Sequence, residues 1–248
     1  MTDAELAGEL AAEAGNLLRR IRDEGIEDGK ALGQRGDREA NALILARLAS
    51  ERPDDAVLSE EAKDDRSRCA MSRVWVIDPL DGTREYGERR DDWAVHVGLA
   101  VDGRPSLGAV AIPDRGEVFV SDAVASLGIL RERPIMVVSR TRAPQIAIKV
   151  AEAIGADLLP MGSAGAKAMA VVDSRADIYV HAGGQYEWDN CAPAAVALGA
   201  GLHASRLDGS PLVYNCENPL LPDIVICRAA LATRVLAAIQ AQVVADRP

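Results

Sequence analysis

The segment "VWVIDPLDGTREY", Val74 to Tyr86, combines an apolar run with residues suited to binding a cation and an anion together. Asp78 and Asp81 stand three positions apart, and like charges this close repel each other unless a cation lies between them. Gly82 lets a ligand approach the backbone, and Thr83 falls near a helix start, where free N–H groups attract an oxyanion. The segment favours a metal and phosphate site, although an isolated D-P-x-D turn with a capping aspartate has the same pattern.

Further carboxylates stand at the predicted ends of other elements. Glu60 and Glu61 end a short strand candidate upstream, Asp37 begins a helix in "GDREAN", and Asp189 begins another in "EWDNCAPA". Each alone is explained as a cap or a surface charge. Together they place acids from both halves of the chain at element ends. Mg²⁺ prefers such oxygen ligands, and two ions about 4 Å apart can hold a phosphoryl group during in-line displacement.

Two glycine-rich segments are similar to nucleotide-binding loops but lack part of each pattern. "GSAGAK", Gly162 to Lys167, has no second glycine before its lysine, and "GAGLHA", Gly199 to Ala204, follows a predicted helix, which favours helix termination. Lys167 keeps two interpretations. Its amine either reaches solvent from an apolar helix start or supplies a positive charge for a second phosphate of the substrate.

The elements that must position these residues form two predicted lobes. Residues 1–130 are predicted to form an α+β lobe that carries most of the metal ligands, and residues 131–248 an α/β lobe that supplies Asp189 and substrate contacts. An irregular stretch at 121–133 separates them.

The hydrophobic pattern and the turn residues give the elements of each lobe. The first lobe has a capping box at Thr2–Glu5, a helix, a loop over 23–37, a second helix that stops by Pro53, and strands at 56–61, 74–77, 93–103, 107–112 and 116–121. Its ladder is expected to end at Pro79, and Asp102-Gly103 to form a hairpin turn. The second lobe has strands at 134–139, 157–162, 176–182 and 223–228 and helices at 143–155, 163–174, 188–201 and 229–243, with Pro193 in a first turn.

Composition narrows the class of protein. The 248 residues carry a net charge of −10, from 38 acidic and 28 basic residues, which argues against non-specific nucleic-acid binding. No run of 18 apolar residues predicts a membrane span, and the acidic N-terminus lacks the features of a signal peptide, so we expect a cytoplasmic protein. Four scattered cysteines indicate reduced thiols, and three scattered histidines argue against a zinc site.

Three motifs in order, "SEE" at 59–61, "DPLDGT" at 78–83 and "WDNCA" at 188–192, resemble the lithium-sensitive, Mg²⁺-dependent phosphatase superfamily. It includes inositol monophosphatases, fructose-1,6-bisphosphatases and bisphosphate nucleotidases. The resemblance covers essentially the whole chain and implies an α/β, layered αβαβα sandwich, with a mixed or antiparallel sheet in the first lobe and a smaller sheet flanked by helices in the second. Ser59 and Cys191 depart from the pattern without removing a ligand.

Within this superfamily, "DPLDGTREY" is similar to the CysQ-type 3′(2′),5′-bisphosphate nucleotidases, in which a basic residue, Glu and an aromatic residue follow the threonine. "HAGG", His181 to Gly184, stands where inositol monophosphatases place an acidic inositol-binding residue. The resemblance therefore implies Mg²⁺-dependent hydrolysis of the 3′-phosphate of adenosine 3′,5′-bisphosphate to AMP, with 3′-phosphoadenylyl sulfate as a related substrate, in sulfate assimilation. Activity as an inositol-1-monophosphatase or a fructose-1,6-bisphosphatase, and a non-catalytic binding role, are the alternatives.

The resemblance also implies roles for individual residues. Glu60, Asp78 and the Leu80 carbonyl would hold one Mg²⁺, Asp78, Asp81 and Asp189 a second, and a third would contact Glu60 largely through water. Catalysis would use Asp37, Thr83 and Glu60, with Thr83 oriented by Asp37 to help deprotonate the attacking water. Substrate would contact Asp81, Gly82, Thr83, Arg84, Ser163, Lys167 and Glu187.

Two features stay open at this point. The segment "REYGERRDD", Arg84 to Asp92, is dense in charge and is either a solvated loop or a cover that contacts the substrate. The expected partner is a small phosphorylated substrate, with no nucleic acid and no membrane. A homodimer is compatible with the sequence but does not follow from it.

Overall fold

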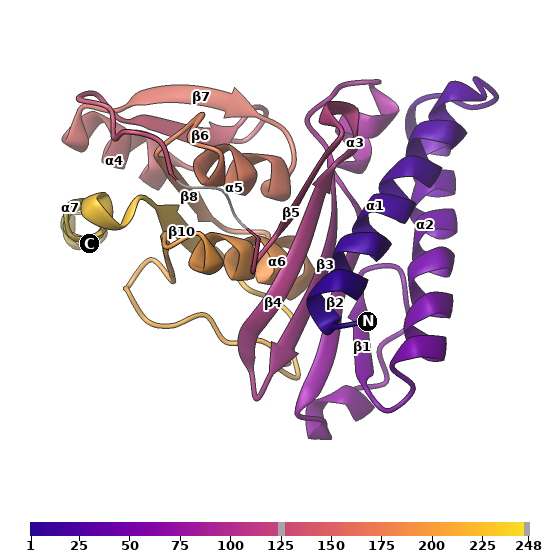
Figure 1. Ribbon diagram of the computed structural model, residues 1–248. Helices are drawn as coiled ribbons and strands as arrows, with labels where there is room; N and C mark the ends of the chain where they lie inside the picture. Colours follow the sequence, from indigo (N-terminus) through magenta and orange to yellow (C-terminus); the bar gives the residue numbers. More distant parts are fainter. Residues whose placement is uncertain (124–126, 246–248) are drawn as a thin grey trace.

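A computed structural model describes residues 1–123 and 127–245, in five layers that alternate between helices and sheets (Figure 1). Two sheets of five strands each are separated by a central pair of helices, α5 (Ala164–Val172) and α6 (Glu187–Gly199). The outer layers are α1 (Asp3–Asp23) with α2 (Gly29–Glu51) on one side, and α4 (Gln145–Ile154) with α7 (Ala232–Ala245) on the other. The αβαβα architecture predicted from the motifs is confirmed.

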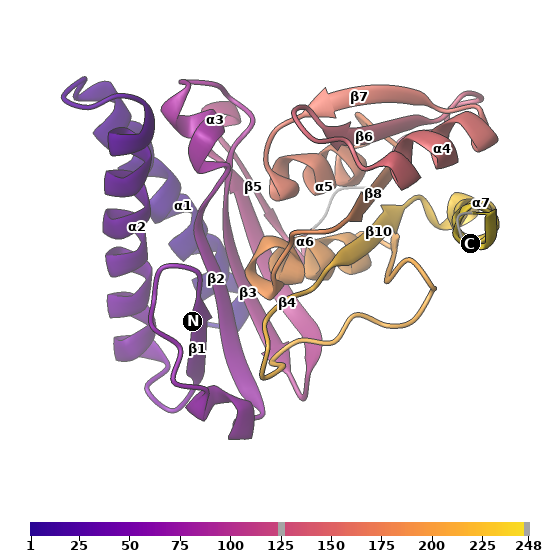
Figure 2. The ribbon, with the colours of Figure 1, turned by 180° about the vertical axis from the view of Figure 1, so that it is seen from behind.

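The first sheet is built from residues before 121 and is covered on both faces. Its strands lie in sequence order: β1 (Ala56–Ser59), β2 (Arg73–Asp81), β3 (Ala94–Val101), β4 (Arg104–Ile112) and β5 (Glu117–Val120). Only β1 and β2 are parallel. Helices α1 and α2 cover one face of this sheet, and α5 and α6 cover the other (Figure 2). Trp75 packs in the cluster on the side of α1 and α2, and Val76 in the cluster on the side of α5 and α6, so alternate residues of β2 are buried in two cores and its sequence is one apolar run.

The second sheet is built from residues after 134 and is mixed. Its order is β7-β6-β8-β10-β9, with β6 (Ile135–Ser139), β7 (Asp157–Met161), β8 (Ile178–Ala182), β9 (His203–Ser205) and β10 (Asp223–Cys227). Strand β6 is parallel to β7 and β8, whereas β10 is antiparallel to both of its neighbours. The three-residue strand β9 was not predicted, because it is too short to show a period.

A single apolar core joins the two sheets through the central helices. It contains Val110 of the first sheet, Met169 of α5, Val196 of α6 and Ile226 of the second sheet. Because these side chains pack in one cluster, the two halves of the chain are held against each other. Residues 124–126, which belong to the stretch predicted to separate the lobes, lie outside the described residues.

The predicted loop over 23–37 is wrong in its second half, because α2 already begins at Gly29. Asp37 therefore lies inside a helix rather than at a helix start. The glycines that suggested a loop allow close packing instead: a Cβ on Gly33 would lie 2.5 Å from Cγ2 of Thr83, and one on Gly36 would lie 2.8 Å from a methyl group of Leu18. The missing side chains let α2 approach the segment that follows β2.

The prolines also act differently from the expectation. The ladder between β2 and β3 does not end at Pro79 but is interrupted by a bulge, and it resumes where Asp81 pairs with Ala94. A residue without an N–H is tolerated in such a bulge, which re-aims the neighbouring side chains. Pro193 lies beyond the first turn of α6, which begins at Glu187. The Asp102-Gly103 hairpin is confirmed, with positive φ at both residues.

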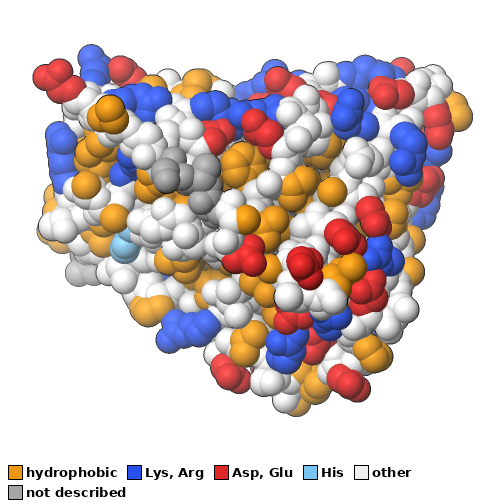
Figure 3. All heavy atoms as spheres, viewed as in Figure 1, with side chains coloured by type: hydrophobic (Ala, Val, Ile, Leu, Met, Phe, Trp, Pro, Cys, Tyr) orange, Lys and Arg blue, Asp and Glu red, His pale blue; other side chains and the backbone are white. Residues whose placement is uncertain are grey.

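Charge on the surface is mixed. On the face seen in Figure 3, the basic side chains of the described residues are interspersed with acidic ones. Within the described ranges, no helix combines the length and apolar character needed to cross a bilayer.

Candidate metal and phosphate site

Three carboxylates from distant parts of the chain meet at one end of β2. Asp78 and Asp81 flank the bulge of β2, and Asp189 stands in the first turn of α6; one oxygen of each lies within 4.8 Å of the others. Glu60 stands beside this group because β1 and β2 are parallel and end at the same edge of the sheet, and the Glu60 amide donates a hydrogen bond to the Ile77 carbonyl oxygen at 3.2 Å. The fold therefore brings three of the predicted metal ligands together and places Glu60 next to them.

Asp78, Asp189 and Glu60 form no salt bridge among the described residues. Burial raises the pKa of Asp78 well above its ordinary value, and the negative charges of Glu60 and Asp81 raise it further. Burial and then Asp81 raise the pKa of Asp189 to about 7. Partial burial of the carboxylate, and then the negative charge of Asp81, raises the pKa of Glu60 to about 6, although the residue as a whole is exposed. Neighbouring acids with raised pKa values, which offer only oxygen atoms, fit a hard divalent cation such as Mg²⁺.

Asp81 is the exception in this group. Burial alone would raise its pKa, but the charge of His96 and hydrogen bonds to Asp81 hold the pKa below the ordinary range. Its Oδ2 accepts the Ser163 hydroxyl and the Gly165 amide, the latter at 2.6 Å, and lies 3.2 Å from Nε2 of His96. Asp81 is therefore a fixed negative charge at the centre of the cluster.

Thr83 and Asp37 form a second group beside these acids. The Thr83 hydroxyl lies 3.2 Å from the Leu80 carbonyl oxygen and 3.5 Å from Oδ1 of Asp37. Burial raises the pKa of Asp37 to about 7, and the charges of Glu61 and Glu60 add to the shift. Asp37 is thus tuned toward the pH range in which a carboxylate can accept a proton during a reaction.

Gly82 connects the two groups, between Asp81 and Thr83. Its φ of +90° is left-handed, and a Cβ there would lie 3.2 Å from Cβ of Ser163 and 3.3 Å from Cβ of Trp93. Only glycine meets both demands. The residue starts α3 (Thr83–Gly87) and exposes its backbone beside the acidic cluster.

A cleft of about 410 Å³ opens beside the acidic cluster. Asp81, Gly82 and Asp189 line it, together with the cationic side chains of Arg84, Arg142 and Lys167. The sequence-predicted Ser163 also lines the cleft, whereas Thr83 lines a different hollow. Sequence reasoning missed Ser139, Thr141, Arg142, His181 and Gln185. Ser139 is the last residue of β6, and Thr141 and Arg142 follow it. Open α/β sheets bind ligands at the carboxyl ends of their strands, and this rule could have found all three.

The first interpretation of Lys167, an amine that reaches solvent, is wrong. The residue is 5% exposed, and Nζ donates hydrogen bonds to the carbonyl oxygens of Gly162 and Ser163. It also lies 5.5 Å from the centre of the Tyr179 ring. Burial lowers the pKa of this amine. A positive charge held at the cleft wall fits the alternative, contact with an anionic part of the substrate.

Glu187 is not part of the cleft. Its carboxylate is buried and accepts hydrogen bonds from the backbone N–H groups of Asn215 at 2.7 Å and Cys216 at 2.8 Å. The side chain therefore ties the first turn of α6 to the loop around Asn215. The substrate contact expected for Glu187 has no support in this geometry, because both oxygens are already engaged.

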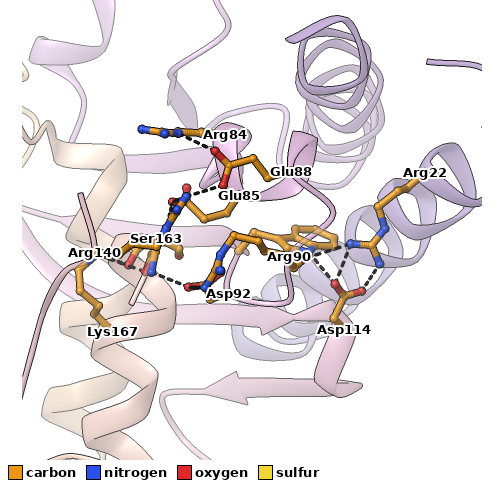
Figure 4. Close-up of polar contacts among 12 residues, drawn as sticks. Arg22, Arg84, Glu85, Glu88, Arg90, Asp92, Asp114, Arg140, Ser163 and Lys167 are labelled. Atoms are coloured by element: carbon orange, nitrogen blue, oxygen red, sulfur yellow. Dashed lines mark hydrogen bonds and ion pairs between the residues drawn. The ribbon is translucent and has the colours of Figure 1, made fainter. Parts of the chain in front are cut away.

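The charged segment Arg84 to Asp92 is not simply a solvated loop, because it begins in a helix and makes hydrogen bonds to the other half of the chain. Its first residues form α3, and Glu85 and Glu88 both accept hydrogen bonds from Arg140 of the other half, at 2.9 and 2.6 Å (Figure 4). Arg84 donates to Glu88 at 2.8 Å, and Asp92 accepts the Gly162 amide at 2.6 Å. We call Arg84, Glu85, Glu88 and Arg140 the ion-paired wall. It stands beside the cleft and joins the two halves.

The layered fold and the acidic cluster define the class, and comparison with known proteins agrees. The profile described as "Inositol monophosphatase family" matches residues 2–244, so the chain belongs to the inositol monophosphatase family. Among solved structures, CysQ from Bacteroides thetaiotaomicron superposes with a TM-score of 0.80 and 26% identity over 92% of this chain and 97% of that one. An inositol monophosphatase from Anabaena reaches 0.77 with 21% identity over 96% and 94% of the two chains, which shows the fold alone.

Curated relatives carry more specific names. A 3′-phosphoadenosine 5′-phosphate phosphatase of Mycobacterium leprae is 52% identical over 255 residues, 97% of this chain and 94% of the relative. The protein of that name from Mycobacterium tuberculosis is 52% identical over 92% of this chain and 89% of the relative. The 3′(2′),5′-bisphosphate nucleotidase CysQ of Escherichia coli is 30% identical, over 73% and 79%. The superfamily inferred from the three motifs is confirmed.

Proposed function

We propose that this protein is a Mg²⁺-dependent 3′(2′),5′-bisphosphate nucleotidase that converts adenosine 3′,5′-bisphosphate to AMP and phosphate. One observation carries the proposal: the carboxylates of Asp78, Asp81 and Asp189 converge beside a cleft that Arg142 and Lys167 also line. Such a cleft matches a substrate with two phosphates, one to be cleaved beside the cations and one to be held. The names of the mycobacterial relatives support the same substrate. The proposal extends to 3′-phosphoadenylyl sulfate and a role in sulfate assimilation in the cytoplasm.

The metal would be held by the acidic cluster and one carbonyl group: Glu60, Asp78, Leu80, Asp81 and Asp189. We propose two or three ions. Bound Mg²⁺ would neutralise the scissile phosphate and make water a better nucleophile at neutral pH. The residues present fit this group, because they offer only oxygen atoms, and because burial and then neighbouring negative charges raise the pKa values of Asp78 and Asp189.

The remaining chemistry falls to Thr83, Asp37 and the backbone of Gly82. Water attacks phosphorus while the bond between phosphorus and the 3′ oxygen breaks, and the leaving oxygen takes up a proton from solvent. The proton of the attacking water passes through the Thr83 hydroxyl toward Asp37, whose pKa of about 7 suits it to accept one. The amides of Gly82 and Thr83, at the start of α3, would stabilise developing charge on the phosphoryl oxygens. The chain's residues supply no covalent nucleophile in this scheme.

A panel of phosphate-release assays tests the proposal. We expect kcat/KM with saturating Mg²⁺ to be highest for adenosine 3′,5′-bisphosphate, with AMP as the nucleotide product. EDTA should abolish turnover, and excess Mg²⁺ should restore it. A higher kcat/KM for inositol 1-phosphate or fructose 1,6-bisphosphate would replace the proposed substrate while keeping the phosphatase. Nucleotide binding without phosphate release would establish a binding protein instead.

A further inference from the structure

His96 lies between two segments that bring carboxylates from opposite halves of the chain. It belongs to β3, pairs across the ladder with Asp78, and is fully buried. Its Nδ1 lies 3.0 Å from the Trp188 carbonyl oxygen, and its Nε2 lies 3.2 Å from Oδ2 of Asp81. Trp188 directly precedes Asp189. One imidazole ring thus contacts Asp81 at one end and the backbone that carries Asp189 at the other.

We propose that His96 is a positioning residue that fixes the separation and orientation of Asp81 and Asp189 for cation binding. The ring is rigid and its two nitrogens face oxygen acceptors on different segments, so neither segment can move toward the other without meeting the ring. This inference rests on the proposed function, because it takes Asp81 and Asp189 as metal ligands. It adds a residue from outside the three family motifs.

The surroundings of Asp81 show what the contact does to this carboxylate. The Ser163 hydroxyl, the Gly165 amide and Nε2 of His96 all lie against the same oxygen, Oδ2. Among the described residues, none of the hydrogen bonds uses Oδ1, which leaves that oxygen for a cation. Nε2 of His96 and Oδ2 of Asp81 lie 3.2 Å apart, which is an ion-pair distance, but their geometry is not that of a hydrogen bond. His96 therefore acts on Asp81 as a spacer, while the two directed bonds set the plane of the carboxylate.

Gly165 lies against the Nε2 end of the ring. A Cβ at this position would lie 2.1 Å from Nε2 of His96 and 3.0 Å from Cβ of Ala94. The ring therefore fits beside Asp81 only because residue 165 has no side chain. A substitution at Gly165 therefore provides a second way to displace the His96 ring without replacing any carboxylate residue.

Mn²⁺ binding to the metal-free protein, measured by calorimetry or by electron paramagnetic resonance, tests this role without substrate. We expect His96→Leu and His96→Asn to raise the Mn²⁺ Kd by about tenfold or more, as loss of a partner of a metal ligand commonly does. Asn can still reach Trp188 but is too short to reach Asp81. His203→Asn is the matched control, because His203 pairs with Ser205 on β9, and it should leave the Kd unchanged. Circular dichroism establishes that each variant is folded, and the Asn variant serves if the Leu variant is not.

Gly165→Ala gives an independent arm. The added methyl group should push the ring and raise the Mn²⁺ Kd in the wild-type background, but raise it less in a His96→Asn background, where the side chain is smaller. Folded His96 variants that bind Mn²⁺ like the wild type would overturn the proposal, and so would equal effects of Gly165→Ala in both backgrounds. Failure of the wild type itself to bind Mn²⁺ would instead refute the proposed metal-dependent function.

Discussion

The carboxylates beside the cleft fall into two groups with opposite surroundings. In the ion-paired wall, Glu88 accepts hydrogen bonds from Arg84 and Arg140, which lower its pKa, and Glu85 also pairs with Arg140. In the acidic cluster, Asp78 and Asp189 have raised pKa values and no salt bridge among the described residues. Acids that already have a cationic partner hold the two halves of the fold together. Acids without one are arranged to receive a cation from outside.

Removing one unpaired acid should have the largest effect. We expect Asp189→Asn to lower kcat/KM for adenosine 3′,5′-bisphosphate by on the order of 10³-fold or more, because it deletes one member of a unit whose parts act together. Glu88→Gln in the ion-paired wall is the matched control and should stay close to the wild type. Equal losses in the two variants would remove the distinction between the groups.

Asp37→Asn should have the next largest effect, about 10²-fold or more on kcat, if Asp37 accepts a proton. Asp37 must be ionised to do so, and its pKa is raised to about 7, so wild-type kcat/KM should rise with pH through about pH 7 and level off above it. Bound cations would shift this limb to lower pH. The variant should lack the limb, and a wild-type profile that is flat from pH 5 to 8 would contradict the role.

The stability of the metal-free protein should fall as pH rises, and bound Mg²⁺ should oppose this loss. Asp189 and Glu60 have pKa values of about 7 and about 6 in the folded protein, above their ordinary values. The folded state therefore binds protons more tightly than the unfolded state, and stability is lost as pH rises from about 4 to about 7. Mg²⁺ at about 100 times its Kd should add roughly 2.7 kcal/mol, or about 5–10 °C in Tm, and more at pH 8 than at pH 5. Differential scanning fluorimetry with EDTA and with MgCl₂ measures this, and an equal Mg²⁺ shift at both pH values would contradict it.

Breaking the ion-paired wall should cost stability rather than metal binding. Arg140→Ala removes partly exposed pairs to Glu85 and Glu88, each worth about 0–1 kcal/mol, so we expect Tm to fall by roughly 2–4 °C. The Mn²⁺ Kd should not change. A large loss of metal affinity in this variant would show that the wall and the acidic cluster are one unit.

Arg84→Ala should have the smallest effect. The side chain lines the cleft, is largely exposed and is shared with Glu88, so its loss should lower kcat/KM for the bisphosphate by about fivefold at most. AMP, which lacks the 3′-phosphate, should inhibit both proteins to a similar extent if Arg84 contacts that phosphate alone. Identical kcat/KM values for wild type and variant would exclude a substrate contact.

The sequence was sufficient to predict the acidic cluster, because its acids stand at strand and helix ends and match three ordered motifs. It was not sufficient for residues whose role depends on what approaches them in space. Gly33 and Gly36, which precede Asp37, indicated a loop. They lie instead on the side of α2 that packs closely against Thr83 and Leu18. Glu187 lies within two residues of Asp189 but its carboxylate turns to the loop at Asn215. His96 stands in an apolar strand, where nothing in the pattern reveals Asp81 on the neighbouring strand and Trp188 on α6.

The most direct test of the central claim is anomalous diffraction from crystals of the protein soaked in Mn²⁺, recorded above and below the manganese absorption edge. The account predicts an anomalous peak at coordination distance from Asp78, Asp81 and Asp189 together, beside Thr83. Mn²⁺ bound only elsewhere, or an empty position among these three carboxylates at a concentration that supports turnover, would contradict it.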